Sequence, residues 1–165
     1  MRNRHEVFAV DRIATGYDAV REIWLADPLG ILQRATTTGL SGLFGAKLRV
    51  PVGPFEITSE IVIDIVDIEQ CRSSTDEPAT KLEIEWGAMR SPELFPIMRA
   101  TMTIYPLSPT ETALELCGTY EPPLGVVGEA ADAIAMRHVA KESVAHFLRD
   151  VARLLGSRVS QGTAA

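Results

Sequence analysis

The stretch VVGEAADAIAMRHVAKESVAHFLRDVARLL (residues 126–155) decides the fold of this chain. Apolar residues recur in it at spacings of three and four, the period of an amphipathic α-helix. This apolar stripe contains Ala133, Met136, Ala140, Val144, Phe147, Val151 and Leu154. Gly156 supplies a stop signal. We therefore expect a domain over residues 1–156 that ends with this helix, and a flexible tail over residues 157–165.

Upstream of this helix the apolar period changes to two, which is typical of half-buried β-strands. The stretches that we expect to form strands are residues 5–13, 46–52, 55–66, 82–88, 98–105 and 114–120. Their short connections favour an antiparallel meander, because parallel pairing needs crossovers of about a dozen or more residues. The sequence thus predicts a sheet of six or seven antiparallel strands.

Two short helices are expected after the first strand. Thr15 and Asp18 have the spacing of a reciprocal helix cap, so we predict a helix over residues 19–26. Asp27 before Pro28 then repeats the signal of a capping residue followed by proline at the first helical position. A second short helix should follow over residues 28–33.

These elements define an α+β fold with room for a cavity. The long helix must bury its apolar stripe, and the apolar face of the sheet is the surface that can cover it. Because twisted sheets curl, a straight helix cannot touch all of the concave face. The remaining space is either a solid core of large side chains or a site for a ligand.

The order of elements over residues 4–155 resembles the START/SRPBCC superfamily, the helix-grip fold of birch-pollen allergens and polyketide cyclases. The stretches most similar to that superfamily are residues 23–28, 82–86, 94–96 and 118–148. The resemblance implies a curved sheet around a long C-terminal helix. It also implies that the chain falls in an uncharacterised bacterial branch of the superfamily. It also implies that the cavity holds lipids, sterols, polyketides or hormones, and in a few members carries out cyclisation. The glycine-rich loop of the plant allergens is reduced here to the turn at residues 50–55.

Residues on the inward faces of these elements are the candidates for ligand binding. They are Ser59, Ile61, Trp86, Met98, Met102, Tyr120, Met136, Arg137, Ala140 and Phe147. Arg137 lies within about 40° of the centre of the apolar stripe on a helical wheel, so its guanidinium needs partners. It could bind a ligand carboxylate, but a structural pair with Glu121, Asp11 or a strand-end carbonyl is favoured. For Tyr120, Trp86 and Ser59, simple packing or local hydrogen bonding is the alternative to ligand contact.

Composition excludes several other functions. A formal net charge of −6 with no basic cluster argues against nucleic-acid binding. No stretch reaches the ~20 apolar residues of a membrane span, and the N-terminus has no signal-peptide core, so we expect a cytoplasmic protein. Cys71 and Cys117 match no metal spacing and should be free thiols. The helical row His138, Glu142, His146 and Asp150 should be a solvated face, so neither metal nor cofactor is expected.

Three functions remain open at this stage. The first is binding or carrying of an apolar or amphipathic small molecule. The second is a cyclase or aromatase reaction that uses Arg137, Tyr120 and Asp11. The third is a protein-interaction module, which predicts an exposed apolar patch. The oligomeric state is left open.

Overall fold

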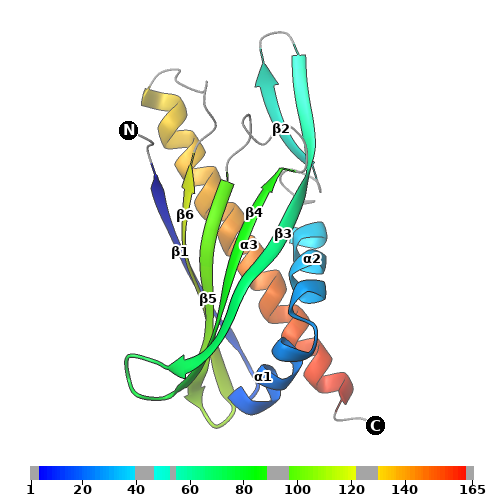
Figure 1. Ribbon diagram of the computed structural model, residues 1–165, viewed down its shortest axis with the longest axis vertical. Coiled ribbons are helices and arrows are strands. Elements are labelled where there is room, and N and C mark those ends of the chain that lie inside the picture. The colour runs from blue at the N-terminus through cyan, green and yellow to red at the C-terminus, as the bar shows by residue number, and fades with distance from the viewer. Residues whose placement is uncertain (1–3, 40–46, 53–54, 89–96, 122–129, 163–165) are drawn as a thin grey trace.

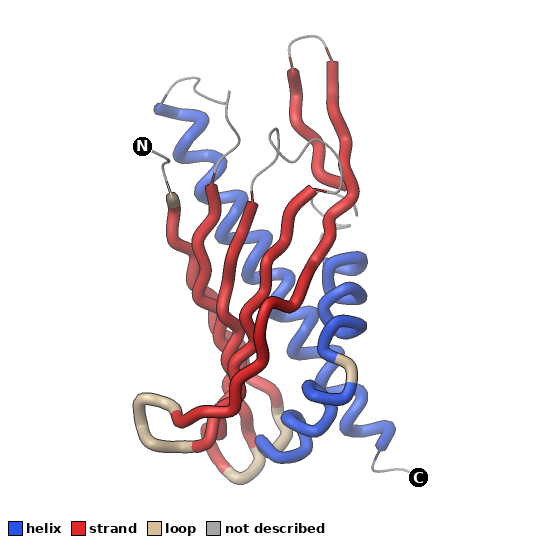
Figure 2. The backbone as a smooth tube through the Cα atoms, viewed as in Figure 1, coloured by secondary structure: helices blue, strands red, loops and turns tan. Residues whose placement is uncertain are grey.

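The computed structural model describes residues 4–39, 47–52, 55–88, 97–121 and 130–162, and within these ranges it leaves out the side chains of residues 37–61, 88, 97, 121, 130–140 and 143. Within these ranges the chain forms six strands and three helices. Figures 1 and 2 show the sheet in front of the longest helix. In chain order the elements are β1 (His5–Ile13), α1 (Tyr17–Ala26), α2 (Pro28–Gly39), β2 (Lys47–Val52), β3 (Phe55–Arg72), β4 (Pro78–Ala88), β5 (Ile97–Ser108), β6 (Glu111–Glu121) and α3 (Ala130–Gly162).

The strands form one antiparallel sheet in the order β1-β6-β5-β4-β3-β2. Helix α3 crosses behind this sheet, α1 lies at its lower end, and α2 lies beside β3 (Figure 1). We call the face toward α3 the inner face and the opposite one the outer face. The predicted α+β architecture, with a curved sheet, a long C-terminal helix and two short helices after the first strand, is confirmed.

Strand β3 is the longest strand and contains an irregularity. It has 18 residues, and its register with β4 shifts between Ile65 and Asp67. A shift of this kind leaves one residue, Val66, without a cross-strand partner, which defines a β-bulge. The broken apolar alternation at Val66 in the sequence therefore has a structural cause.

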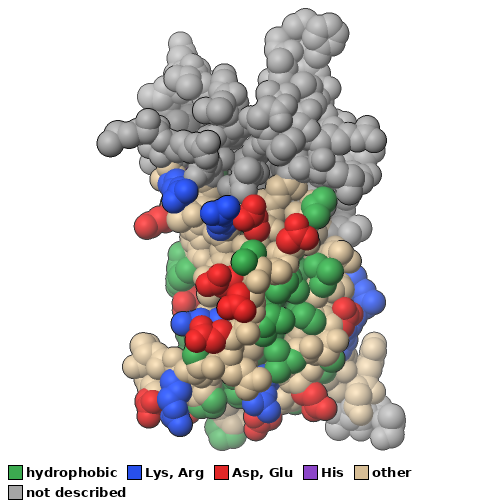
Figure 3. Space-filling view, in the orientation of Figure 1, with side chains coloured by type: hydrophobic (Ala, Val, Ile, Leu, Met, Phe, Trp, Pro, Cys, Tyr) green, Lys and Arg blue, Asp and Glu red, His purple; other side chains and the backbone are tan. Residues whose placement is uncertain are grey.

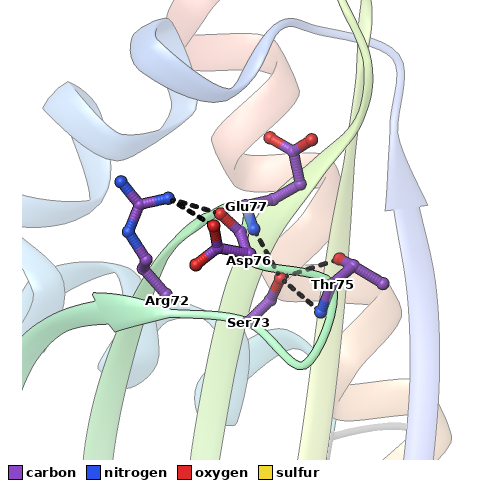
Figure 4. A network of polar contacts seen from close by, with 5 residues as sticks. All are labelled: Arg72, Ser73, Thr75, Asp76 and Glu77. Atoms are coloured by element: carbon purple, nitrogen blue, oxygen red, sulfur yellow. Dashed lines mark hydrogen bonds and ion pairs between the residues drawn. The ribbon is translucent and has the colours of Figure 1, made fainter.

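The turn from β3 to β4 is held by its own polar groups (Figure 4). The Ser73 hydroxyl accepts hydrogen bonds from the backbone amides of Thr75 and Glu77, and Arg72 donates to the Asp76 carbonyl at 2.6 Å. Asp76 has a φ of 62°, a left-handed conformation that aspartate tolerates better than most residues. This turn fixes the register of the two strands at the lower end of the sheet.

The two short helices begin differently. The reciprocal cap predicted for Thr15 and Asp18 is wrong, because α1 begins after Gly16 and has no side-chain cap. The carbonyl of Thr15 instead accepts a hydrogen bond from the Thr112 hydroxyl at 2.7 Å, which ties this connection to β6. The cap of α2 is as predicted, since Asp27 accepts a hydrogen bond from the Gly30 amide at 3.0 Å. Helix α2 then continues to Gly39, beyond the predicted end.

Helix α3 continues past its predicted stop. It has 33 residues and ends at Gly162, so the stop at Gly156 is wrong and residues 157–162 are helical. Gly156 lies near Ile13, at a position where an added Cβ would be in ordinary contact with the Ile13 side chain, and Arg158 forms an ion pair with Asp27 at 3.3 Å. These tertiary contacts offset the weak helix propensity of glycine. Among the described helices, none is both long enough and apolar enough to cross a membrane.

Candidate functional site

Five side chains in register form a continuous row across the inner face, which we call the aromatic row. It contains Ile63, Trp86, Met98, Tyr120 and His5, from β3, β4, β5, β6 and β1 respectively. Ile63, Met98 and Tyr120 are buried, whereas Trp86 is half-buried. The row therefore presents a broad apolar surface toward α3, and part of its tryptophan is accessible.

Phe147 of α3 faces the aromatic row from the opposite side. Its ring lies edge-on to Trp86, with the ring centroids 5.3 Å apart. Val144, one turn earlier in α3, is also buried. Edge-to-face aromatic contacts of this kind stabilise a pair by about 0.5–1.5 kcal/mol beyond simple burial. This contact connects the sheet to α3 at the level of the row.

The β1 end of the aromatic row is its polar end. The imidazole of His5 lies 5.2 Å from the ring of Tyr120, measured between centroids. The two side chains add an imidazole and a phenol to a surface whose other members are Ile63, Met98 and the indole of Trp86. A guest with one polar end would find hydrogen-bonding groups here and apolar groups along the rest of the row.

The next row down the inner face has its smallest side chains in the middle. Ala100 and Gly118 are paired there, between Ile84 on one side and Val7 on the other. A Cβ on Gly118 would lie 2.8 Å from the Cβ of Ala100 and 2.9 Å from the carbonyl oxygen of Arg99, so only glycine fits. The small side chains of this pair therefore lie directly below the larger ones of Met98 and Tyr120 on the inner face.

The lower part of the inner face is sealed. Leu82, Met102 and Leu116 are in register, and none of them has exposed surface; we call these three the sealed row. Trp24 of α1 and Ile31 of α2 are equally buried. The predicted site residue Met102 therefore lies in the closed core, about 13 Å along β5 from Met98.

The structure brings four of the predicted site residues together, namely Trp86, Met98, Tyr120 and Phe147. Met102 lies apart from them in the sealed row, and the side chains of the remaining five lie outside the described residues; these are Ser59, Ile61, Met136, Arg137 and Ala140. Their backbones place Ser59 opposite Leu48, Ile61 opposite Ala88, and the remaining three in α3. Sequence reasoning missed His5, although His5 shares the inward parity of Val7.

The helical row considered for metal binding is a solvated face where the structure describes it. Glu142 and His146 are exposed, and Asp150 accepts a hydrogen bond from Arg153 at 3.0 Å. The side chain of His138 lies outside the described residues. Within the described part of the chain, no three His, Cys, Asp or Glu residues are grouped as metal ligands would be.

Two hollows lined by described residues open on the surface away from the space between the sheet and α3. One, of about 490 Å³, is at the base of the domain between the start of α1 and the turns near Pro78 and Pro109. The other, of about 830 Å³, lies on the outer face of the sheet between Phe8 and Val66. Both are distinct from the aromatic row.

The fold has counterparts among solved structures. No family model and no curated protein sequence matches the chain. A conserved protein from Geobacillus kaustophilus superposes with a TM-score of 0.54 at 14% identity, over 94% of this chain and 96% of that one. Zhui aromatase/cyclase from Streptomyces sp. R1128 gives a TM-score of 0.48 at 18% identity, over 95% and 96% of the two chains. Norcoclaurine synthase from Thalictrum flavum gives 0.48 at 12%, over 93% and 87%.

The likeness to the Geobacillus protein establishes a shared fold. The helix-grip resemblance predicted from the sequence is therefore confirmed at the level of the fold. Identity of 14% carries no information about the ligand, so the function must be argued from the residues of this chain.

Proposed function

We propose that this protein binds or carries an apolar or amphipathic small molecule, such as a lipid, a sterol or a polyketide-like compound, between the inner face of the sheet and α3. The observation that carries the proposal is Trp86. It lies on the inner face between buried neighbours in the aromatic row, yet keeps part of its surface accessible. A tryptophan in a closed core would be covered on all sides, as Trp24 is.

The arrangement of α3 supports space at this level. The helix packs mainly against β1, α1 and α2, at one side and at the lower end of the sheet. A curled sheet that meets a straight helix along one side must diverge from it across the others. At the level of the aromatic row, the side chains that span this divergence are Trp86 and Phe147. A guest would lie against these rings and against Met98, whose flexible thioether adapts to varied shapes.

The proposal extends to the location of the protein. Cys71 and Cys117 are both free thiols in the structure. Unpaired cysteines are typical of reducing compartments, which supports a place in the cytoplasm.

Native mass spectrometry with a defined panel tests the proposal. The protein would be incubated with oleate, cholesterol and naringenin, representing a fatty acid, a sterol and a polyphenol. We expect a one-to-one complex with at least one of them, and Trp86→Ala should weaken it about tenfold because a large part of the apolar contact is lost. Leu107→Ala, a change of an exposed residue near the end of β5, is the matched control and should leave binding unchanged. Binding of no panel member, or equal losses in both variants, would contradict the proposal.

A cyclase or aromatase reaction in the same space is the second candidate. It is favoured by the contact of His5 with Tyr120, because an imidazole and a phenol can exchange protons with a bound substrate. Asp11 is not part of this pair: it is opposite Leu114, six residues and about 20 Å along β6 from Tyr120. If this candidate holds, His5→Gln and Tyr120→Phe should each slow turnover of a polyketide substrate at least about tenfold while leaving its binding intact. Unchanged turnover in both variants would exclude it.

A further inference from the structure

The hollow on the outer face of the sheet is a second candidate site, independent of the space next to α3. We call it the outer hollow; its volume is about 830 Å³ and it extends from β1 to β3. Its floor carries small side chains, Cys117 and Thr101, which are paired in register on β6 and β5. Phe8 closes the β1 end and Val66 the β3 end. The outer hollow therefore has short side chains on part of its floor and an apolar residue at each end.

Both end residues are apolar and exposed. The exposed fractions are 61% for Phe8 and 64% for Val66, the two highest among the large apolar side chains that the structure describes. Val66 is the unpaired residue of the bulge in β3, and bulges are known to re-aim side chains next to functional sites. The bulge thus supplies one apolar end of the outer hollow at the expense of a regular strand.

The charges around the outer hollow are mainly negative. Glu6, Glu83 and Glu85 line it, and Arg99, the cation among its described lining residues, donates a hydrogen bond to Glu85 at 2.8 Å. Figure 3 shows this outer face, with acidic side chains gathered over its middle.

Two cross-strand pairs of like charge add to this field. Asp64 is directly opposite Glu85, and Asp67 is directly opposite Glu83, on the strands that border the hollow. Like charges in directly opposed positions destabilise a sheet. A cation that lies across the hollow would relieve this repulsion. The acidic pairs therefore favour a positively charged partner.

We propose that the outer hollow binds an extended basic peptide segment of a partner protein, with an apolar side chain at each end and arginine or lysine between them. The two apolar ends are separated by four strand spacings, or about 19 Å. An extended peptide covers this length in about six residue steps, with every second side chain facing the sheet. A second copy of this chain is disfavoured as the occupant, because its net charge of −6 would place one negative surface against another.

A designed heptapeptide with the sequence LSRSRSL tests the proposal directly. In an extended conformation its two leucines and two arginines share one face, and the leucines are about 20 Å apart. Fluorescence anisotropy of the labelled peptide should show saturable binding that weakens about fivefold or more when salt rises from roughly 50 to 500 mM. The charge-reversed peptide LSESESL and the peptide SSRSRSS, which lacks the apolar ends, should each bind at least about tenfold more weakly.

Surface variants locate the binding. Phe8→Ser and Glu83→Lys should each weaken the LSRSRSL complex about tenfold. The matched controls are Val10→Ser, which removes the next exposed apolar residue on the same face of β1, and Glu22→Lys, which makes the same change of charge on α1. Both controls should leave the affinity unchanged. Glu83→Lys also removes one like-charge pair, so a loss of binding cannot be attributed to unfolding.

Cys117 gives an independent readout, because its thiol lines the outer hollow. Saturating LSRSRSL should slow the alkylation of Cys117 by iodoacetamide at alkaline pH at least about fivefold and leave that of Cys71 unchanged. The proposal is overturned by any of three results: no saturable binding, equal binding of LSESESL, or equal losses in the control variants. A dimer in sedimentation experiments that dissociates on Phe8→Ser would likewise overturn it in favour of self-association.

Discussion

The aromatic row and the sealed row are parts of the same inner face, yet they differ in how completely the rest of the protein covers them. Leu82, Met102 and Leu116 have no exposed surface, whereas Trp86 is half-buried about 13 Å further along the strands. Both rows show the same alternation of apolar residues in the sequence. The difference lies in the shorter helices: α1, at the lower end of the sheet in Figure 1, contacts β5 and β6, and α2 contacts β3. An apolar sheet face thus becomes part of the closed core where helices cover it on all sides. Where they do not, it is a candidate lining for a ligand site.

The largest expected effect is on the sealed row. Leu116→Ala should lower the free energy of unfolding by about 4 kcal/mol, because the lost side chain leaves a cavity in a fully packed region. Urea denaturation measures this loss. Leu107→Ala, a change of the same type at an exposed position, serves as the control and should cost less than about 0.5 kcal/mol.

The same truncation in the aromatic row should cost less. Met98→Ala should lower the free energy of unfolding by about 2 kcal/mol, because a more open surrounding can relax around the missing atoms. It should also lower the affinity for oleate in the native mass spectrometry assay, whereas Leu116→Ala should not. If Met98→Ala lowers the free energy of unfolding as much as Leu116→Ala does, the two rows are equally sealed.

A smaller effect is expected where the lower end of the domain is closed. Asp27 caps α2 and also binds Arg158 of α3. Asp27→Ala should therefore lower the free energy of unfolding by about 1 kcal/mol in thermal or urea denaturation. Asp18→Ala is the control, since Asp18 makes a long, exposed contact with Arg21 at 3.9 Å and should contribute little. Equal losses of stability in the two variants would mean that Asp27 does not stabilise the contact between α2 and α3.

The smallest effect tests which face of the sheet each side chain of β6 lies on. The comparison of the aromatic row with the sealed row depends on this assignment. Leu116 points inward and the next residue, Cys117, lies exposed on the outer face. Burial, and then the negative charge of Glu115, raise the pKa of the Cys117 thiol above its usual value, and the thiol donates to the Glu115 carboxylate at 3.6 Å. Glu115→Gln removes the charge that disfavours the thiolate, so the pKa should fall. Alkylation of Cys117 near pH 8 should then become about two- to threefold faster; an unchanged or slower rate would contradict the assignment.

Much of this fold could be predicted from the sequence, because burial imposes a simple alternation on strands with one wet face. The facing of Trp86, Met98 and Tyr120 follows from parity alone. Two local features could not be predicted this way. The cap at Thr15 gives way to a contact with Thr112, and α3 continues past Gly156 to a segment in which Arg158 pairs with Asp27. These outcomes depend on residues that are distant in the sequence.

The candidate sites were predictable to different degrees. Parity placed the aromatic residues on one face, but it could not show that Trp86, Met98 and Tyr120 share one row, since register depends on turns and on the bulge at Val66. The outer hollow was missed, although the sequence carried a signal. Apolar residues occupy both odd and even positions of β1, as Val7 and Phe8 do, which indicates a strand with apolar side chains on each face of the sheet.

The most direct test of the account is to locate a bound guest relative to the two faces of the sheet. Intermolecular nuclear Overhauser effects between ¹³C-labelled oleate and the protein would do so. We expect contacts from oleate to the Met98 methyl group and to the rings of Trp86 and Phe147. Contacts confined to Phe8 and Val66 on the outer face, or to the turns at the base of the domain, would contradict a ligand site between the sheet and α3.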